Sequence, residues 1–171
     1  MARFGRRPAV EGLDLEPGER VLSSAILPGP VTVTASDRRL LVTRPDQPLW
    51  ARTWVEVDAV GWGGEDRVLT VVTVDGAAVH VELGKDDQLQ LAQVVRERVQ
   101  ASLVTWRAVA VPGGRVRIAM RQGRDGLVVQ EIPDPGVVVG GEAARASVDR
   151  ARRELAASVG AQDSAGGTDH R

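Results

Sequence analysis

Cysteine is absent from the sequence of 171 residues, and histidine occurs only twice, at His80 and His170. Without cysteine, disulfide frameworks, thiol nucleophiles and thiolate metal sites are excluded together. Because His170 is the penultimate residue, a histidine-based catalytic site would depend on His80 alone. These absences favour a binding protein over an enzyme, and we expect no cofactor.

An excess of charge of one sign is also missing, since 22 basic residues face 23 acidic ones. A net charge near −1 gives no overall attraction to nucleic acid or to anionic membranes, so such a partner would need a local basic patch. Arginine outnumbers lysine 21 to 1, and valine outnumbers isoleucine 28 to 3. This bias is typical of codon usage in a GC-rich bacterial genome, so abundant arginine is not by itself evidence for arginine chemistry.

No run of apolar residues approaches the roughly 18 that a membrane-spanning helix needs. Residues 1–10 include three arginines but are not followed by the apolar stretch of a signal peptide. We therefore expect a cytoplasmic protein without a transmembrane segment.

The clearest local pattern is a hairpin around Asp75-Gly76, which separates two β-branched runs at 68–74 and 77–83. Asp-Gly is a strong signal for a two-residue turn, because both central residues of that turn need a positive φ. Such a turn places most of the apolar side chains on one face and His80 with Glu82 on the other. The predicted core face consists of Val68, Thr70, Val72, Val74, Ala77, Val79, Val81 and Leu83.

Further strands and one helix complete the first part of the chain. We expect a second hairpin around Asp37-Arg38, with Val31, Val33, Ala35, Leu40 and Val42 on one side, and three more strands at 20–27, 49–53 and 58–62. A helix then begins after Asp86 or Asp87 as the N-cap. Its apolar stripe is formed by Ala92, Val95, Val99 and Leu103.

The remainder predicts strands at 106–111, 115–122 and 127–132, followed by a helix over 142–159 that ends at Gly160. Three strands and one helix make a small core, so we expect this portion to dock on the first domain or on a second copy of the chain. The predicted organisation is a flexible segment 1–17, a domain 18–104, a β-β-β-α extension 105–160 and a disordered tail 161–171.

Two segments resemble bacterial pleckstrin-homology-like (PH-like, GRAM-like) domains. Residues 33–42 (VTASDRRLLV) resemble the turn between the second and third strands of the family, and residues 54–60 (WVEVDAV) resemble its tryptophan-acidic-aliphatic segment. The whole chain looks like a group of actinobacterial proteins. The resemblance implies a mainly β protein of the α+β class, with a seven-stranded barrel capped by a C-terminal helix and extended by the β-β-β-α portion.

The resemblance does not extend to a lipid site. Phosphoinositide-binding members of the family carry a basic cluster on the loop between the first two strands. Here that loop is Leu27-Pro28-Gly29-Pro30, and the four residues that follow it include no basic one. Binding of phosphoinositide-type lipids is therefore not supported.

The best candidate site is the strand 115–121. Alternation places Val116, Ile118 and Met120 on its buried side and Arg115, Arg117 and Arg121 on the other. These arginines are a candidate site for the phosphates of RNA or DNA, or for an acidic protein surface. No aromatic residue interleaves with them along the strand to stack on bases, and a solvated strand face is the alternative interpretation.

Other chemical candidates are weaker. His80 shares the solvent side of its strand with Glu82, as an acid–base pair would, but no further partner is tied to it by spacing. The acidic runs lack the spacing of a calcium loop, and the glycine-rich stretches 61–64 and 140–141 do not continue into a phosphate loop. We expect the tryptophans to fill the barrel ends and the junction between the two portions, with about one in four exposed as an anchor for a partner; they are Trp50, Trp54, Trp62 and Trp106.

The sequence therefore predicts an interaction or scaffold module without catalysis, which binds a protein partner or self-associates. The rival hypothesis is a nucleic-acid-binding protein that uses Arg115, Arg117 and Arg121. An enzyme acting through His80 is the third hypothesis.

Overall fold

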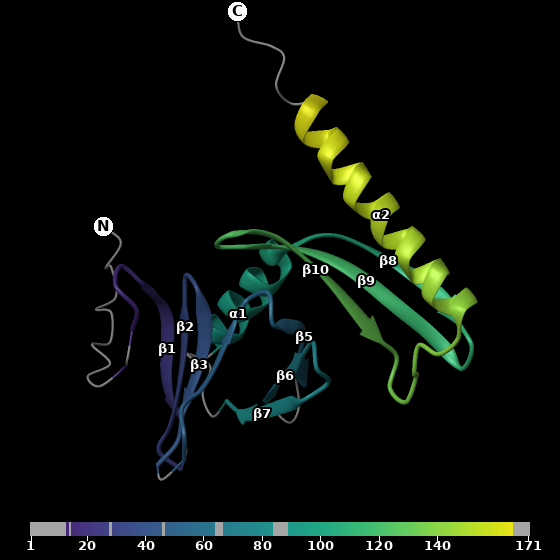
Figure 1. Cartoon of the computed structure of the whole chain (residues 1–171). Helices are drawn as coiled ribbons and strands as arrows, with labels where there is room; N and C mark the ends of the chain where they lie inside the picture. Colours follow the sequence, from purple (N-terminus) through teal and green to yellow (C-terminus); the bar gives the residue numbers. More distant parts are fainter. Residues whose placement is uncertain are drawn as a thin grey trace, which may run out of the picture. The chain divides into compact units, whose positions relative to one another are not determined.

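The computed structural model describes residues 13, 15–27, 29–45, 47–63, 67–83 and 89–165, with side chains described as far as Val159. Within these residues the chain is mixed α+β and mostly β, with three antiparallel sheets and two helices (Figure 1). It divides into two compact units, one with the residues up to 100 apart from 74–76 and the other with 74–76 and the residues from 101 onward. Below, the first unit means the residues up to 100 and the second unit those from 101 onward.

A four-stranded sheet in sequence order opens the first unit. It consists of β1 (Val21–Leu27), β2 (Val31–Ser36), β3 (Arg39–Thr43) and β4 (Trp50–Thr53). Ala35 pairs with Leu40 across β2 and β3, and the side chains of both are fully buried. The predicted hairpin around Asp37-Arg38, with its core face, is confirmed.

The second sheet, of β5 (Val57–Gly63), β6 (Val68–Thr73) and β7 (Ala78–Glu82), corrects the predicted register around Asp75-Gly76. Leu69 pairs with Val81, one residue away from the pairing expected of a two-residue turn. The Thr73 N–H donates to the Ala77 carbonyl at 2.9 Å, so the loop has three residues. Its last residue, Gly76, has a φ of +83°, as a three-residue hairpin loop requires.

This change of register moves the opposite side of β6 into the core. Leu69 and Val71 are buried, whereas Val68 and Val72 are only half-buried. β6 carries valine on both faces, so alternation alone did not decide which face is buried. The prediction that His80 faces solvent is confirmed, because its side chain is exposed.

One helix, α1 (Leu89–Ser102), completes the core of the first unit. Its buried side chains, Leu91, Val95 and Val99, pack with residues of both sheets. The proposed N-caps Asp86 and Asp87 lie outside the described residues. Leu103 was expected in the helix. It is instead the first residue of the next strand, where it pairs with Arg121.

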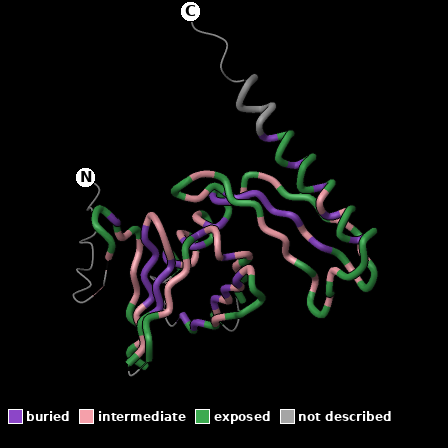
Figure 2. Tube along the Cα trace, in the orientation of Figure 1, coloured by how far each residue is buried: buried purple, intermediate pink, exposed green. Residues whose placement is uncertain are grey.

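The second unit is a three-stranded sheet with one helix. The strands β8 (Leu103–Val111), β9 (Gly114–Gly123) and β10 (Gly126–Pro133) lie in the order β10-β9-β8, and the helix is α2 (Glu142–Ala165). The helix continues through Gly160, where the sequence predicted its end. A separate core forms between β9 and α2, and buried positions recur along the helix (Figure 2). Its buried residues are Val116, Ile118, Met120, Val148, Ala151, Leu155 and Val159.

The start of β9 requires glycine. Gly114 has a φ of +157°, and a Cβ atom there would lie 2.7 Å from the Val137 side chain. This close approach lets the segment after β10 pack against the turn between β8 and β9. The Asp134 N–H, which donates to the Arg115 carbonyl at 2.9 Å, holds the same segment in place.

Candidate functional site

The sheet of the second unit has two faces of different character. The face with Ile118 is covered by α2. At its margins Arg107 forms an ion pair with Glu154, and Glu131 accepts hydrogen bonds from Arg145 and Arg152 on α2. This face is closed by its own helix and therefore belongs to the core.

The opposite face carries the predicted arginines. Alternation along β9 places Arg115, Arg117, Ala119 and Arg121 on it, and the antiparallel register adds residues from the neighbouring strands. We call the exposed and half-exposed part of this surface the arginine face. It consists of Leu103, Trp106, Ala108 and Ala110 from β8, Arg115 and Arg117 from β9, and Val128, Gln130 and Ile132 from β10.

Two of the three predicted arginines reach the surface. The side chain of Arg115 is 69% exposed, and its Nε lies 3.4 Å from Asp134 Oδ2, so the ion pair is solvated and weak. Arg117 is half-buried. Both are placed to meet a negatively charged group on the same side of the sheet.

Arg121 does not belong to the surface, and this part of the prediction is wrong. The residue is only 1% exposed, and its Nη1 donates to Ser102 Oγ at 2.9 Å. Its cross-strand neighbours are the apolar residues Leu103 and Val128. Alternation predicts which side of a sheet a residue faces, but not whether that side is open to solvent at that position.

Trp106 is the residue that the sequence analysis missed. It lies directly opposite Ala119 and is therefore on the same face as Arg117, and it is 55% exposed. The sequence held a signal for it, since counting back from the Pro112-Gly113 turn pairs residue 106 with residue 119. An aromatic side chain thus joins the arginines from the neighbouring strand rather than from their own.

The tryptophans consequently fall into two groups. Trp54 is buried, and its Nε1 donates to the Ser36 carbonyl at 3.1 Å; Trp50 is half-buried, with the Arg52 guanidinium 5.4 Å from its ring centre. Trp62 and Trp106 are exposed, so more of the tryptophans reach the surface than the expected proportion of about one in four.

Charge is unevenly divided along the chain. Residues 101–159 include nine arginines and six acidic residues, whereas residues 13–100 include nine basic and 14 acidic ones. The near-neutral total therefore conceals a basic second unit. A local excess of this kind attracts an anionic partner over about 8–10 Å at moderate ionic strength.

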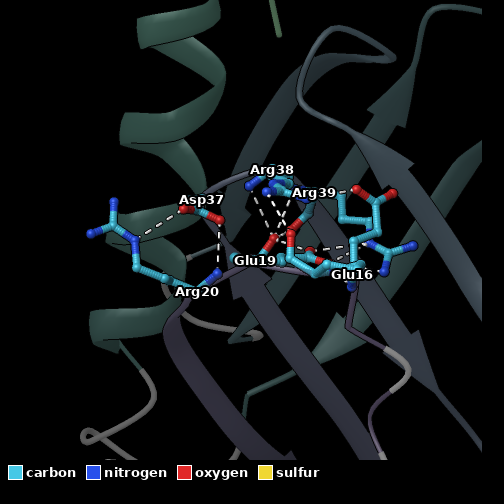
Figure 3. A network of polar contacts seen from close by, with 8 residues as sticks. Glu16, Glu19, Arg20, Asp37, Arg38 and Arg39 are labelled. Carbon is cyan, nitrogen blue, oxygen red and sulfur yellow. Dashed lines mark hydrogen bonds and ion pairs between the residues drawn. The ribbon is translucent and has the colours of Figure 1, made fainter.

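A second group of charges surrounds the β2–β3 turn, and we call it the turn cluster (Figure 3). The Glu19 carboxylate receives hydrogen bonds from the Arg39 guanidinium, at 2.9 to 3.2 Å, and from the Ser36 hydroxyl at 2.5 Å. Beside it, Asp37 binds the backbone and side chain of Arg20, and Arg38 binds Glu16. The cluster comprises Glu16, Glu19, Arg20, Ser36, Asp37, Arg38 and Arg39.

The protonation of the turn cluster follows from these contacts. Burial by itself raises the pKa of Glu19, but hydrogen bonds from Arg39, Ser36 and the Glu16 N–H, with the Arg39 charge, bring it below its ordinary value. The Arg20 N–H is the main cause of the lowered pKa of Asp37. Each carboxylate is already paired with an arginine, so the turn cluster fastens residues 16–20 to the hairpin and offers no free charge to a ligand.

His80 contacts Thr70 across the hairpin, with 3.1 Å between Nδ1 and Oγ1. Glu82 is exposed on the same strand. Among the described residues, no group of three or more His, Cys, Asp or Glu side chains is arranged to hold a metal ion. The helices within the described ranges include none long and apolar enough to cross a membrane.

The different surroundings of Arg115 and Arg121 lead to a stability prediction. Arg121→Ala is expected to lower the free energy of unfolding by about 2 kcal/mol, because it empties a buried position and removes a partner of the Ser102 hydroxyl. Arg115→Ala is expected to change it by less than about 1 kcal/mol, since its ion pair is exposed. Urea denaturation followed by circular dichroism measures both, and equal effects would contradict the burial of Arg121.

Comparisons with protein-family models, with curated proteins and with solved structures found no match to this chain. The expected resemblance to PH-like domains therefore depends on the sequence alone, chiefly on residues 33–42 and 54–60.

Proposed function

We propose that the protein is a non-catalytic binding module and that the arginine face binds a negatively charged partner. The main support for the proposal is that Trp106 is exposed and is a diagonal neighbour of Arg117 on the sheet. Both residues lie on the face that α2 does not cover. An exposed aromatic residue next to an arginine is typical of binding surfaces. Both side chains project from strands, so their spacing is fixed before a partner arrives.

Charge favours an anionic partner over a second copy of the same face. In a two-fold contact through this surface, the basic faces of two copies, each with Arg115 and Arg117, would meet one another. Juxtaposed like charges are unfavourable at an interface. An acidic protein surface or a nucleic acid meets the same arginines with complementary charge.

We further propose that residues 18–104 form a PH-like domain, that 105–160 extend it, and that the protein acts in the cytoplasm. The support is the order of the elements, in which seven antiparallel strands precede one helix. α1 contributes Leu91, Val95 and Val99 to a core that also contains residues of both sheets. An interaction role fits this arrangement, since related folds serve as scaffolds for many unrelated sites.

Reversing the charge of the arginine face tests the proposal. We expect the double variant Arg115→Glu and Arg117→Glu to bind polyglutamate and short oligonucleotides at least about tenfold more weakly than the wild type at physiological ionic strength. The measurement is fluorescence anisotropy of the labelled anion with the full chain. The matched control reverses two exposed arginines of α2, Arg150→Glu and Arg153→Glu, and should stay within about twofold of the wild type.

The two variants carry the same change in net charge, so they separate a local site from general attraction. Equal weakening in both would show that the arginine face has no special role. Unaltered binding of every anion by the Arg115→Glu and Arg117→Glu variant would contradict the proposed function directly.

A further inference from the structure

Small side chains follow Trp106 on the same face of its own strand. The next residues of β8 on the same face, Ala108 and Ala110, are both exposed, whereas the cross-strand neighbour Ala119 is buried and pairs on its other side with half-buried Gln130. The two exposed alanines have only a methyl group, so no long side chain from these positions stands over the indole. On this side, along β8, the surface can accept a planar group against the ring.

Arg117 lies within reach of the same planar group. It pairs directly with Ala108, which makes it a diagonal neighbour of Trp106 on this face. Diagonal positions of an antiparallel pair are about 7–8 Å apart, a distance that aromatic and long side chains span. A nucleotide stacked on the indole would therefore have its phosphate within reach of the Arg117 side chain.

Single-stranded nucleic acid combines these two features. Each nucleotide has a flat base and an adjoining phosphate, and single-stranded binding proteins stack bases on exposed aromatic residues within a basic surface. A duplex keeps its bases stacked on one another, so the indole could not reach a base face. An acidic peptide would match the charge of Arg117 but would leave Trp106 without a matching group.

We propose that the arginine face binds single-stranded RNA or DNA, with one base stacked on Trp106 and the adjoining phosphate held by Arg117. The proposal rests on the function proposed above and names the partner of that surface. Arg115 contributes less, because it pairs with Ala110 and so lies farther along the face from Trp106 than Arg117 does. Arg121 takes no part, since it is buried.

Removing the indole is the sharpest test. Trp106→Ala is expected to weaken the binding of labelled oligo-dT or oligo-U of about 12 nucleotides by about 5- to 150-fold, the range for loss of one base–aromatic stack. Binding of polyglutamate should remain unchanged, and Trp106→Phe should retain most of the oligonucleotide affinity. The matched control is Trp62→Ala, which removes a tryptophan that is also exposed, at 38%, but lies on β5.

Salt dependence tests the phosphate contact separately. Arg117→Gln is expected to reduce the slope of log affinity against log salt by about 0.7 for a single strand. Trp106→Ala is expected to leave the slope unchanged, because stacking releases no counterion. Comparison of oligo-U with oligo-dT shows whether RNA or DNA is the better ligand.

The possible failures are distinguishable. If the wild type binds polyglutamate through Arg117 but no oligonucleotide, the proposed function stands and this inference falls. The inference also falls if a duplex binds more tightly than the single strand, or if Trp106→Ala binds oligonucleotides as the wild type does. If the binding of polyglutamate and the binding of oligonucleotides are both independent of Arg115 and Arg117, both proposals are wrong.

Discussion

Glu19→Ala is expected to lower the free energy of unfolding by about 3–5 kcal/mol, the range for breaking a buried ion pair from one side. The Glu19 side chain is fully buried, and its loss leaves Arg39, which is 17% exposed, without that carboxylate. The Ser36 hydroxyl and the Glu16 N–H lose the same acceptor. Urea unfolding followed by tryptophan fluorescence suits the measurement, because the Trp54 indole donates to the Ser36 carbonyl inside this region.

Glu16→Ala is the matched control, since it removes a carboxylate of the same turn cluster. The Glu16–Arg38 pair is solvated, with the Glu16 side chain 47% exposed, so its removal should cost less than about 1 kcal/mol. Replacing both buried partners, with Glu19→Leu and Arg39→Met together, should recover much of the loss, because no uncompensated charge is then buried. Similar losses for Glu19→Ala and Glu16→Ala would contradict the structure of the cluster.

The turn cluster also makes stability depend on pH. The pKa of Glu19 is lower in the folded chain than in the unfolded one, so its stabilisation is present above the unfolded pKa. The stabilisation is lost as the pH falls from about 4 downward through the folded pKa. Asp37 acts in the same direction more weakly, because it is partly exposed. In Glu19→Gln the fall in stability below about pH 4 should be shallower than in the wild type.

How far the fold follows from the sequence depends on how clearly the two sides of each strand differ. In β2 the side with Val33 and Ala35 alternates with threonine, and the pairing predicted with β3 is confirmed. In β6 valine occurs on both sides, so the sequence allowed two registers that differ by one residue. The backbone of the turn decided between them through the Thr73 N–H and the positive φ of Gly76.

The candidate site shows a related limit. The sequence placed Arg115, Arg117 and Arg121 on one side of β9, and the sheet register agrees. Which of them is exposed depends on the residues of other elements, such as Ser102 at the end of α1, and no pattern within β9 contains that information. The sequence analysis did not group Trp106 with the arginines, because it is 11 residues from Arg117 in the chain. Only the pairing of β8 with β9 makes the two residues neighbours.

Ile118→Ala is expected to destabilise the second unit selectively, by about 2–5 kcal/mol. Ile118 is fully buried in a core formed by β9 and α2, and none of the residues in that core belongs to the first unit. Because each unit has its own core, we expect amide hydrogen exchange to accelerate in β8–β10 and in α2. The amides of β1–β7 should keep their wild-type protection.

The matched control removes an apolar side chain from the other face of the same sheet. Val128 is 38% exposed, so Val128→Ala should change the free energy of opening, measured by amide exchange, by less than about 1 kcal/mol. If Ile118→Ala instead accelerates exchange equally in β1–β7, the two units unfold together and the second is not stabilised by its own core alone. A loss of amide protection confined to β8–β10 and α2 would show that the second unit is stabilised by its own core. The arginine face belongs to that unit. The packing of α2 on the opposite face of the sheet would then also maintain the spacing of Trp106 and Arg117.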